Sequence, residues 1–210
     1  MTADGTRKRV VVFISGGGSN MLALAKAAEA DGFPAEIVAV FCDKAEAGGL
    51  AKAEALGIPT FTFSRRDHAD KAAHEAAILA ALDTLAPDLI CLAGYMRLLS
   101  GHFISRYEGR ILNIHPSLLP LFPGLHTHRR AIDAGMKIAG CSVHVVTEGM
   151  DEGPIVAQGA VPVMAGDTAE TLAARVLTVE HRLYAAALAA YLTGSGSVAT
   201  QGGATLLSFG

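Results

Sequence analysis

Short apolar runs separated by alanine-rich stretches constrain the fold of this 210-residue chain more than any other feature. The runs span residues 9–15, 36–42, 59–63 and 88–93, and the first two show almost no polar–apolar alternation. A strand without alternation is covered on both faces, as in parallel sheets between helices. The repeated strand–helix–strand order implies right-handed crossovers, so we predict an α/β fold with an open, doubly wound, mostly parallel Rossmann-like sheet.

The second half of the chain has a different pattern. A strand over 110–115 ends at Pro116, and three prolines then mark an irregular stretch. Two longer strands, 138–147 and 155–163, are separated by a turn-rich segment, so we expect them to pair antiparallel. A last helix is expected from Asp167, as its capping residue, to about Leu192, followed by a mobile tail over 194–210. We therefore expect one domain over 8–193, with halves 8–100 and 101–193.

Composition excludes several classes of function. Lys and Arg number 17 against 20 Asp and Glu, a net charge of −3, which argues against a nucleic-acid partner. The most apolar long stretch, 171–192, is interrupted by charged residues, and no run suits a membrane span or a signal peptide. The three cysteines lie in apolar stretches at unrelated spacings, which favours free buried thiols in a reducing compartment. We expect a cytoplasmic protein without a membrane partner.

A glycine-rich loop, Ser15-Gly-Gly-Gly-Ser-Asn20, joins the first strand to the first helix. Backbone amides at such a helix N-terminus, with the Ser19 and Asn20 side chains, can hold a phosphate. The alternative is a tight turn with a capping serine. No Gly-Lys-Ser/Thr follows, which excludes a nucleotide-hydrolysing P-loop. Met21 stands where a dinucleotide site has its third glycine, although Asp43 after the second strand keeps that alternative open.

Polar side chains gather where the strand over 110–115 ends. Alternation places Asn113 and His115 on one face, and an amide with an imidazole suits stabilisation of an oxyanion and proton transfer near neutral pH. The alternative is hydrogen bonding to the irregular loop that follows. Asp151, in the turn-rich segment, can hold His115 protonated, or it can simply form a turn. His126, His128 and His144 have no carboxylate or thiolate at a ligand-like spacing, so we expect no metal site.

Four segments now resemble a known family, the phosphoribosylglycinamide formyltransferases. They are Ile14-Ser-Gly-Gly-Gly-Ser-Asn20, Leu92-Ala-Gly-Tyr-Met-Arg-Leu-Leu-Ser100, Leu112-Asn-Ile-His-Pro-Ser-Leu-Leu-Pro120 and Pro123-Gly-Leu-His-Thr-His128. The resemblance runs from about Val10 to Leu192. It implies a formyltransferase fold and transfer of a formyl group from 10-formyltetrahydrofolate, as co-substrate, to the amino group of glycinamide ribonucleotide, without a metal.

The resemblance also assigns residues. The catalytic positions fall on Asn113, His115 and Asp151. The ribonucleotide and its phosphate fall on Gly18, Ser19, Asn20 and Glu180. The folate positions are Lys71, Met96, Arg97, Leu98, Leu99, Asn113, Thr147, Glu148, Gly149, Met150 and Asp151. On this assignment 8–100 is the phosphate-binding half, and 101–193 is the folate and catalytic half.

Three residues depart from the family pattern, and other functions stay open. Gly17 replaces a common Asn, Lys71 replaces an Arg near the folate tail, and Leu177 replaces a polar substrate contact. A formyltetrahydrofolate hydrolase or another 10-formyltetrahydrofolate-dependent formyltransferase would share the Asn-x-His motif. The hydrolase has a further N-terminal domain, and methionyl-tRNA formyltransferase a further C-terminal one. A nicotinamide-dependent oxidoreductase or a nucleotide-binding module would leave Asn113 and His115 without a role. We expect a monomer or a homodimer.

Overall fold

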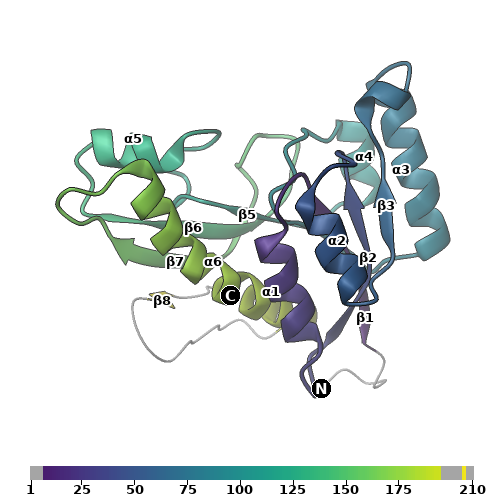
Figure 1. Cartoon of the computed structure of the whole chain (residues 1–210), viewed down its shortest axis with the longest axis horizontal. Helices are drawn as coiled ribbons and strands as arrows, with labels where there is room; N and C mark the ends of the chain where they lie inside the picture. Colours follow the sequence, from purple (N-terminus) through teal and green to yellow (C-terminus); the bar gives the residue numbers. More distant parts are fainter. Residues whose placement is uncertain (1–6, 195–204, 207–210) are drawn as a thin grey trace. The chain divides into compact units, whose positions relative to one another are not determined.

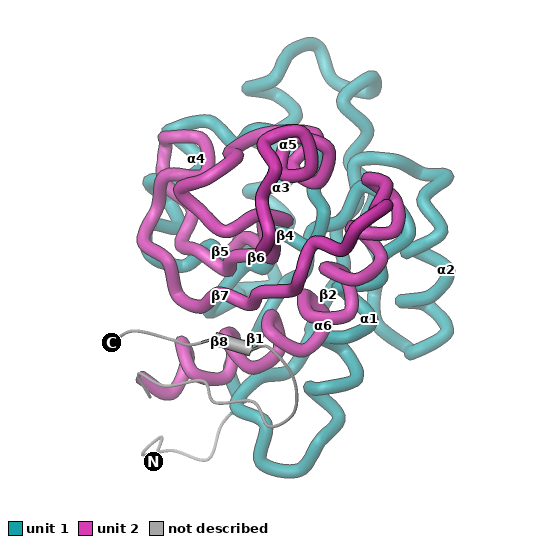
Figure 2. Tube along the Cα trace, turned by 90° about the vertical axis from the view of Figure 1, so that its left-hand side faces the viewer, with its two compact units in different colours: residues 1–112 teal, residues 113–210 magenta. Residues whose placement is uncertain are grey.

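The computed structural model describes residues 7–194 and 205–206 and divides into two units, residues 1–112 and 113–210 (Figure 2). The boundary between the units falls inside strand β5 (Ile111–His115). The single domain expected over 8–193, with its halves 8–100 and 101–193, stays a prediction. Of the predicted mobile tail, only Gly194 and strand β8 (Thr205–Leu206) are described, and the rest lies outside the described residues.

Unit 1 contains the parallel strands predicted from the apolar runs. They are β1 (Lys8–Ile14), β2 (Ala35–Cys42), β3 (Thr60–Thr62) and β4 (Leu89–Leu92), in the order β3-β2-β1-β4. Residues 10–14 of β1 have no exposed surface. Helices α1 (Ser19–Ala28) and α2 (Gly48–Ala55) cover one face of these strands and α3 (Lys71–Leu85) the other (Figure 1). The α/β class and the mostly parallel, doubly wound sheet are confirmed.

Two details of unit 1 differ from the sequence reading. The third helix was expected from about Asp67, but a 3-10 turn, η1 (Arg65–Asp67), precedes α3, and Asp70 caps α3 by accepting a hydrogen bond from the Ala73 N–H (2.8 Å). Helix α4 (Gly101–Arg106) was not predicted. Six residues are too few to show a helical period, and α4 is held by burial of Phe103 and by its Ser100 cap.

Unit 2 carries the antiparallel part of the sheet, in the order β5-β6-β7-β8. Strands β6 (Ile138–Val145) and β7 (Ile155–Pro162) pair antiparallel, as predicted, and β7 also pairs antiparallel with β8. Helix α5 (Thr127–Asp133) follows the proline-rich stretch, and the long helix α6 (Ala169–Thr193) packs on β6 and β7. A Cβ on Gly159 of β7 would lie 2.4 Å from Val179 Cγ1, so the close approach of α6 to β7 requires glycine there.

The start of α6 corrects the expectation that Asp167 caps the helix. Thr168 is the capping residue, and it forms a reciprocal capping box with Thr171. The Asp167 carboxylate instead pairs with both Nη nitrogens of Arg175, at 2.7 and 2.8 Å. A two-point contact with a guanidinium is stronger than a single bond to an amide, so Asp167 is drawn to Arg175 and the threonine takes the cap.

Burial and helix character agree with the composition. Cys42, Cys91 and Cys141 are buried free thiols, as predicted. Among the described residues, no helix combines the length and the hydropathy that crossing a bilayer would require.

Candidate active site

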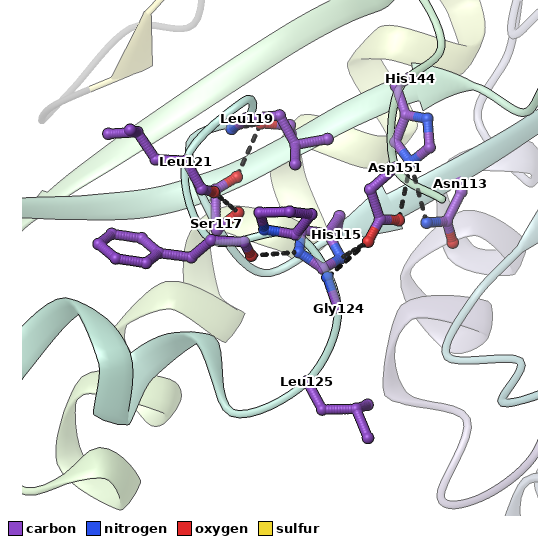
Figure 3. Close-up of polar contacts among 12 residues, drawn as sticks. Asn113, His115, Ser117, Leu119, Leu121, Gly124, Leu125, His144 and Asp151 are labelled. Atoms are coloured by element: carbon purple, nitrogen blue, oxygen red, sulfur yellow. Dashed lines mark hydrogen bonds and ion pairs between the residues drawn. The ribbon is translucent and has the colours of Figure 1, made fainter. Parts of the chain in front are cut away.

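Strand β5 presents two polar side chains at its carboxyl end. Asn113 and His115 lie two residues apart and therefore on one face, while Ile114 between them faces the opposite side and is buried. His115 is only 6% exposed, so its imidazole is largely shielded from bulk water. The pair that the sequence predicted is present in unit 2 (Figure 3).

Both ring nitrogens of His115 face oxygen acceptors. Nε2 lies 3.1 Å from the Phe122 carbonyl oxygen, and Nδ1 lies 3.4 Å from Asp151 Oδ2 (Figure 3). An imidazolium has an N–H for each of these oxygens, whereas a neutral ring has only one. A protonated His115 can therefore donate to the Phe122 carbonyl oxygen and to Asp151 at the same time.

The Asp151 carboxylate is held from several sides. The Gly124 N–H donates to Oδ2 (2.8 Å), and His144 Nε2 lies 3.6 Å from Oδ1. Burial opposes ionisation, but the bonds from His144 and Gly124 and the positive charge that His115 can carry outweigh it. The pKa of Asp151 therefore lies below its usual range.

Asp151 and Phe122 both have left-handed backbones, with φ of 57° and 56°. Such conformations cost on the order of 1 kcal/mol outside glycine and cluster at functional sites. Both residues contact His115, Asp151 through its carboxylate and Phe122 through its carbonyl oxygen. The backbone is therefore strained at the two positions that supply acceptors to His115.

His144 belongs to the same cluster, and sequence reasoning missed it. Its Nε2 lies 3.1 Å from Asn113 Nδ2 (Figure 3), and its Nδ1 lies 3.1 Å from the Val145 carbonyl oxygen. With Nδ1–H given to that carbonyl, a neutral His144 accepts the Asn113 N–H at Nε2. A protonated His144 instead donates to Asp151. We call Asn113, His115, His144 and Asp151 the polar cluster.

A signal for His144 was available in the sequence. Ser142 and His144 lie two apart on β6, so two polar side chains share one face of a strand that is otherwise apolar, and both are buried. The spacing of His126, His128 and His144 raises His144 only as a candidate metal ligand. Within residues 7–194 and 205–206, no group of three or more His, Cys, Asp or Glu side chains is arranged to hold a metal ion.

A second network supports the loop that carries Phe122 and Gly124. Ser142 Oγ donates to the Ser117 carbonyl (2.7 Å) and accepts from the Leu119 N–H (3.0 Å). Gln158 Nε2 donates to Ser142 Oγ and to the Leu119 carbonyl, both at 2.9 Å. These bonds tie the proline-rich loop to β6 and β7, which fixes the acceptors that face His115.

The glycine loop of unit 1 has the geometry expected of an anion site. Gly18 precedes α1 in a left-handed conformation (φ 68°), and a Cβ there would lie 2.9 Å from Gly49 Cα, so glycine is required. Within the part of the chain that the structure describes, no side chain caps α1. Lys52 Nζ also donates to the Gly17 carbonyl (2.8 Å), which places a cation beside the loop. Uncapped amides and a nearby cation both favour an anion, such as the phosphate predicted at Gly18, Ser19 and Asn20.

The first predicted folate segment lies with Lys71 around one cavity of unit 1. The cavity measures about 330 Å³ and is lined by Arg65, Lys71, His74, Glu75, Tyr95, Met96, Arg97, Leu98 and Leu99. Met96 and Leu98 are 61% and 66% exposed, which is unusual for large apolar side chains. The structure therefore places Lys71 with the segment 96–99, as the sequence resemblance implied.

The remaining predicted residues belong to unit 2. Thr147, Glu148, Gly149 and Met150 form the connection between β6 and β7 that leads to Asp151. Asp151 also lines a cavity of about 290 Å³ with Leu119, Pro120, Pro123, Glu152, Gly153 and Ile155. Glu180 lies on α6 and is 7% exposed.

Comparison with known proteins identifies the family. The sequence profile of the family described as Formyl transferase matches residues 8–188. A crystal structure of phosphoribosylglycinamide formyltransferase from Brucella melitensis is 74% identical, with a TM-score of 0.85, covering 93% of this chain and all of that one. Glycinamide ribonucleotide transformylase 1 from Symbiobacterium toebii is 42% identical, with a TM-score of 0.89, covering 96% of this chain and 94% of that one.

Curated relatives include both short and long proteins. Phosphoribosylglycinamide formyltransferase of Escherichia coli is 46% identical over 175 residues, which cover 83% of this chain and 82% of that protein. The trifunctional purine biosynthetic protein adenosine-3 of Bos taurus is also 46% identical, but the chain spans only 19% of its length. The chain therefore belongs to the formyl transferase family, and within it to the phosphoribosylglycinamide formyltransferases.

Proposed function

We propose that the chain is an enzyme of de novo purine biosynthesis that transfers the formyl group of 10-formyltetrahydrofolate to the amino group of 5′-phosphoribosylglycinamide. The product is phosphoribosyl-N-formylglycinamide. The observation that carries this proposal is the contact of His115 with Asp151, because His115 lies on the same strand as Asn113. The similarity of the chain to phosphoribosylglycinamide formyltransferases supports it.

The chemistry follows from the charges that develop during transfer. The neutral amine of the ribonucleotide attacks the formyl carbon, and the carbonyl oxygen becomes an oxyanion in a tetrahedral intermediate. Asn113 Nδ2 and the Nε2–H of a protonated His115, which exchanges the uncharged Phe122 carbonyl for the oxyanion, are the donors that stabilise this oxygen. The carbon–nitrogen bond to the folate then breaks, and the leaving nitrogen takes up a proton from His115 or from a water.

Asp151 has two tasks in this scheme. Its carboxylate, with a pKa below the usual range, stays ionised near neutral pH and can pair with a protonated His115. The same carboxylate can accept the proton that the attacking amine loses. His144 acts through its neighbours, because its Nε2 lies beside both the amide of Asn113 and the carboxylate of Asp151.

The substrates are assigned to the predicted residues. Gly18, Ser19 and Asn20 bind the ribonucleotide phosphate, and Glu180 also contacts that substrate. The folate is assigned to Lys71, the segments 96–99 and 147–151, and Asn113. The cationic cavity beside Lys71 and Arg97 suits the carboxylate end of the folate. We expect a cytoplasmic enzyme, monomeric or homodimeric, whose partners are these two small molecules.

One assay tests the proposal. The protein is incubated with 10-formyltetrahydrofolate, with and without the ribonucleotide, and the folate absorbance is followed. Turnover that requires the ribonucleotide supports the proposal, and formation of the N-formylated product is checked by mass spectrometry. Turnover in the absence of the ribonucleotide would instead support a hydrolase that transfers the formyl group to water.

A further inference from the structure

We infer that Asp43 positions Arg97 for the folate co-substrate. The Asp43 carboxylate accepts a hydrogen bond from Arg97 Nε, so both Nη nitrogens of Arg97 can bind a carboxylate of the ligand. The inference rests on the proposed function, because the folate supplies that carboxylate. Asp43 follows β2 at the carboxyl end of the strand.

The Asp43 carboxylate is buried and forms an ion pair with Arg97. Its side chain is 1% exposed, and Oδ2 lies 2.6 Å from Arg97 Nε. Oδ1 is also buried and has no hydrogen-bond partner among the described residues. A buried carboxylate is costly unless it is paired, so Arg97 is the group that makes the burial of Asp43 tolerable. The reverse also holds, because this pair fixes where the Arg97 guanidinium lies.

Arg97 keeps most of its binding capacity in this arrangement. Nε is the atom that contacts Asp43, and its Nη nitrogens make no hydrogen bond to the described residues. The side chain is 45% exposed and lines the cavity of about 330 Å³ with Lys71 and Arg65. A guanidinium held from behind by Nε offers its Nη edge as a preoriented site for a carboxylate.

The backbone around Arg97 is held by other residues. The Met96 N–H donates to Ser15 Oγ at 2.8 Å, and the Ser100 N–H donates to Glu75 Oε1 at 2.9 Å. The Ser100 hydroxyl also donates to Glu75 Oε2. Since these anchors flank Arg97 on both sides, loss of the Asp43 charge should release the guanidinium and leave the path of the segment unchanged.

The test compares two ligands that differ in one feature. 10-Formyltetrahydrofolate carries the glutamate carboxylates, and 10-formyltetrahydropteroate lacks the glutamate. Isothermal titration calorimetry measures Kd for both ligands on the wild type and on Asp43→Asn. We expect Asp43→Asn to weaken folate binding about 5- to 10-fold, the scale of one charge-assisted contact, and pteroate binding less than about 2-fold. The KM for the ribonucleotide and kcat should stay within about 2-fold.

Asp83→Asn is the matched control. Asp83 contacts Arg106 Nη2 at the same 2.6 Å, but on an exposed part of unit 1 away from this cavity. The same change of carboxylate to amide there should leave both Kd values unaltered. An equal loss in Asp43→Asn and Asp83→Asn would overturn the inference, as would an equal loss for folate and pteroate in Asp43→Asn.

A double-mutant cycle separates positioning from structure. If Asp43 acts through Arg97, then Asp43→Asn adds no further loss of folate affinity to Arg97→Ala. It should also raise the melting temperature of Arg97→Ala, because it removes the unpaired buried charge. A full additional loss of affinity in the double variant would overturn the inference.

The remaining outcomes are also decisive. Should Asp43→Asn fail to fold, Arg97→Lys replaces it, since lysine keeps the charge but has no Nε–H to give Asp43 and no fork. We expect the same folate-specific loss, and unchanged folate affinity would count against Asp43. Calorimetry does not depend on turnover, so a wild type that binds folate but transfers nothing to the ribonucleotide would contradict the proposed function alone.

Discussion

The polar cluster of unit 2 can be compared with segment 95–100 of unit 1, which Ser15, Asp43 and Glu75 anchor. Both use polar side chains, but their contacts differ in length and in the kind of donor. In the polar cluster, the contacts between side-chain atoms measure 3.1 to 3.6 Å, and two of the four residues are histidines, whose rings can both donate and accept hydrogen bonds. In the segment, the side-chain anchors Asp43 and Ser15 make bonds of 2.6 and 2.8 Å to a guanidinium and an amide N–H, and neither of these donors titrates near neutral pH. Longer contacts between titratable groups allow proton transfer. Short contacts to donors that keep their proton instead fix the positions of the Arg97 guanidinium and the Met96 backbone.

The largest expected effect comes from removing the central imidazole. His115→Ala should lower kcat about 10²- to 10⁴-fold, because both a donor to the oxyanion and a proton source are lost. Steady-state kinetics with both substrates gives the measurement. His102→Ala, on the exposed surface of α4, is the matched control and should leave kcat unchanged. If kcat of His115→Ala falls by less than about 10-fold, another residue must carry out the proton transfer.

Asp151→Asn tests whether the charge of the cluster matters more than its shape. We expect kcat to fall roughly 10- to 100-fold with little change in either KM, since the amide keeps the size but has no negative charge beside His115 and cannot accept a proton. A rise in KM at near-normal kcat would make Asp151 a binding residue.

The same variant has a predicted pH signature. The pKa of Asp151 is lowered in the fold, so its ionised form stabilises the protein above the unfolded value of about 4. That contribution is lost as the pH falls through the lower folded value. The free energy of unfolding, measured by urea denaturation for wild type and Asp151→Asn, should therefore differ by a constant amount above about pH 5. The difference should shrink below about pH 4, and a difference independent of pH would contradict the lowered pKa.

His144→Gln should have a smaller effect. Glutamine can accept the Asn113 N–H but cannot carry a charge toward Asp151, so we expect kcat to fall about 3- to 10-fold. The pH profile of kcat should also change, because glutamine cannot take up a proton as histidine can. A purely structural role of His144 would leave that profile unchanged. An unaltered profile would show that His144 only fills space on β6.

Sequence reasoning reached the fold and the centre of the site because both depend on local pattern. The runs over 9–15 and 36–42 predicted parallel strands, and alternation alone placed Asn113 and His115 on one face. The spacing of Ser142 and His144 indicates a polar pair on one face of β6, but the contacts of His144 with Asn113 and Asp151 depend on the pairing of β6 in the sheet, which sequence spacing does not show. The partners of Asp43 and Glu75 escaped for the same reason, since each lies 25 to 54 residues away along the chain.

Glu75→Gln carries the smallest prediction and tests the static side of the comparison. Glu75 is 5% exposed and accepts from the backbone and the hydroxyl of Ser100, the capping residue of α4. Glutamine keeps one oxygen for these bonds and loses the charge, so the free energy of unfolding should fall by about 1–2 kcal/mol. Because Ser15 still holds Met96, kcat should stay unchanged and the KM for the folate should rise no more than about 2-fold. Denaturant unfolding and kinetics together measure both quantities, and a change in the pH dependence of kcat would show that the anchors take part in proton movement after all.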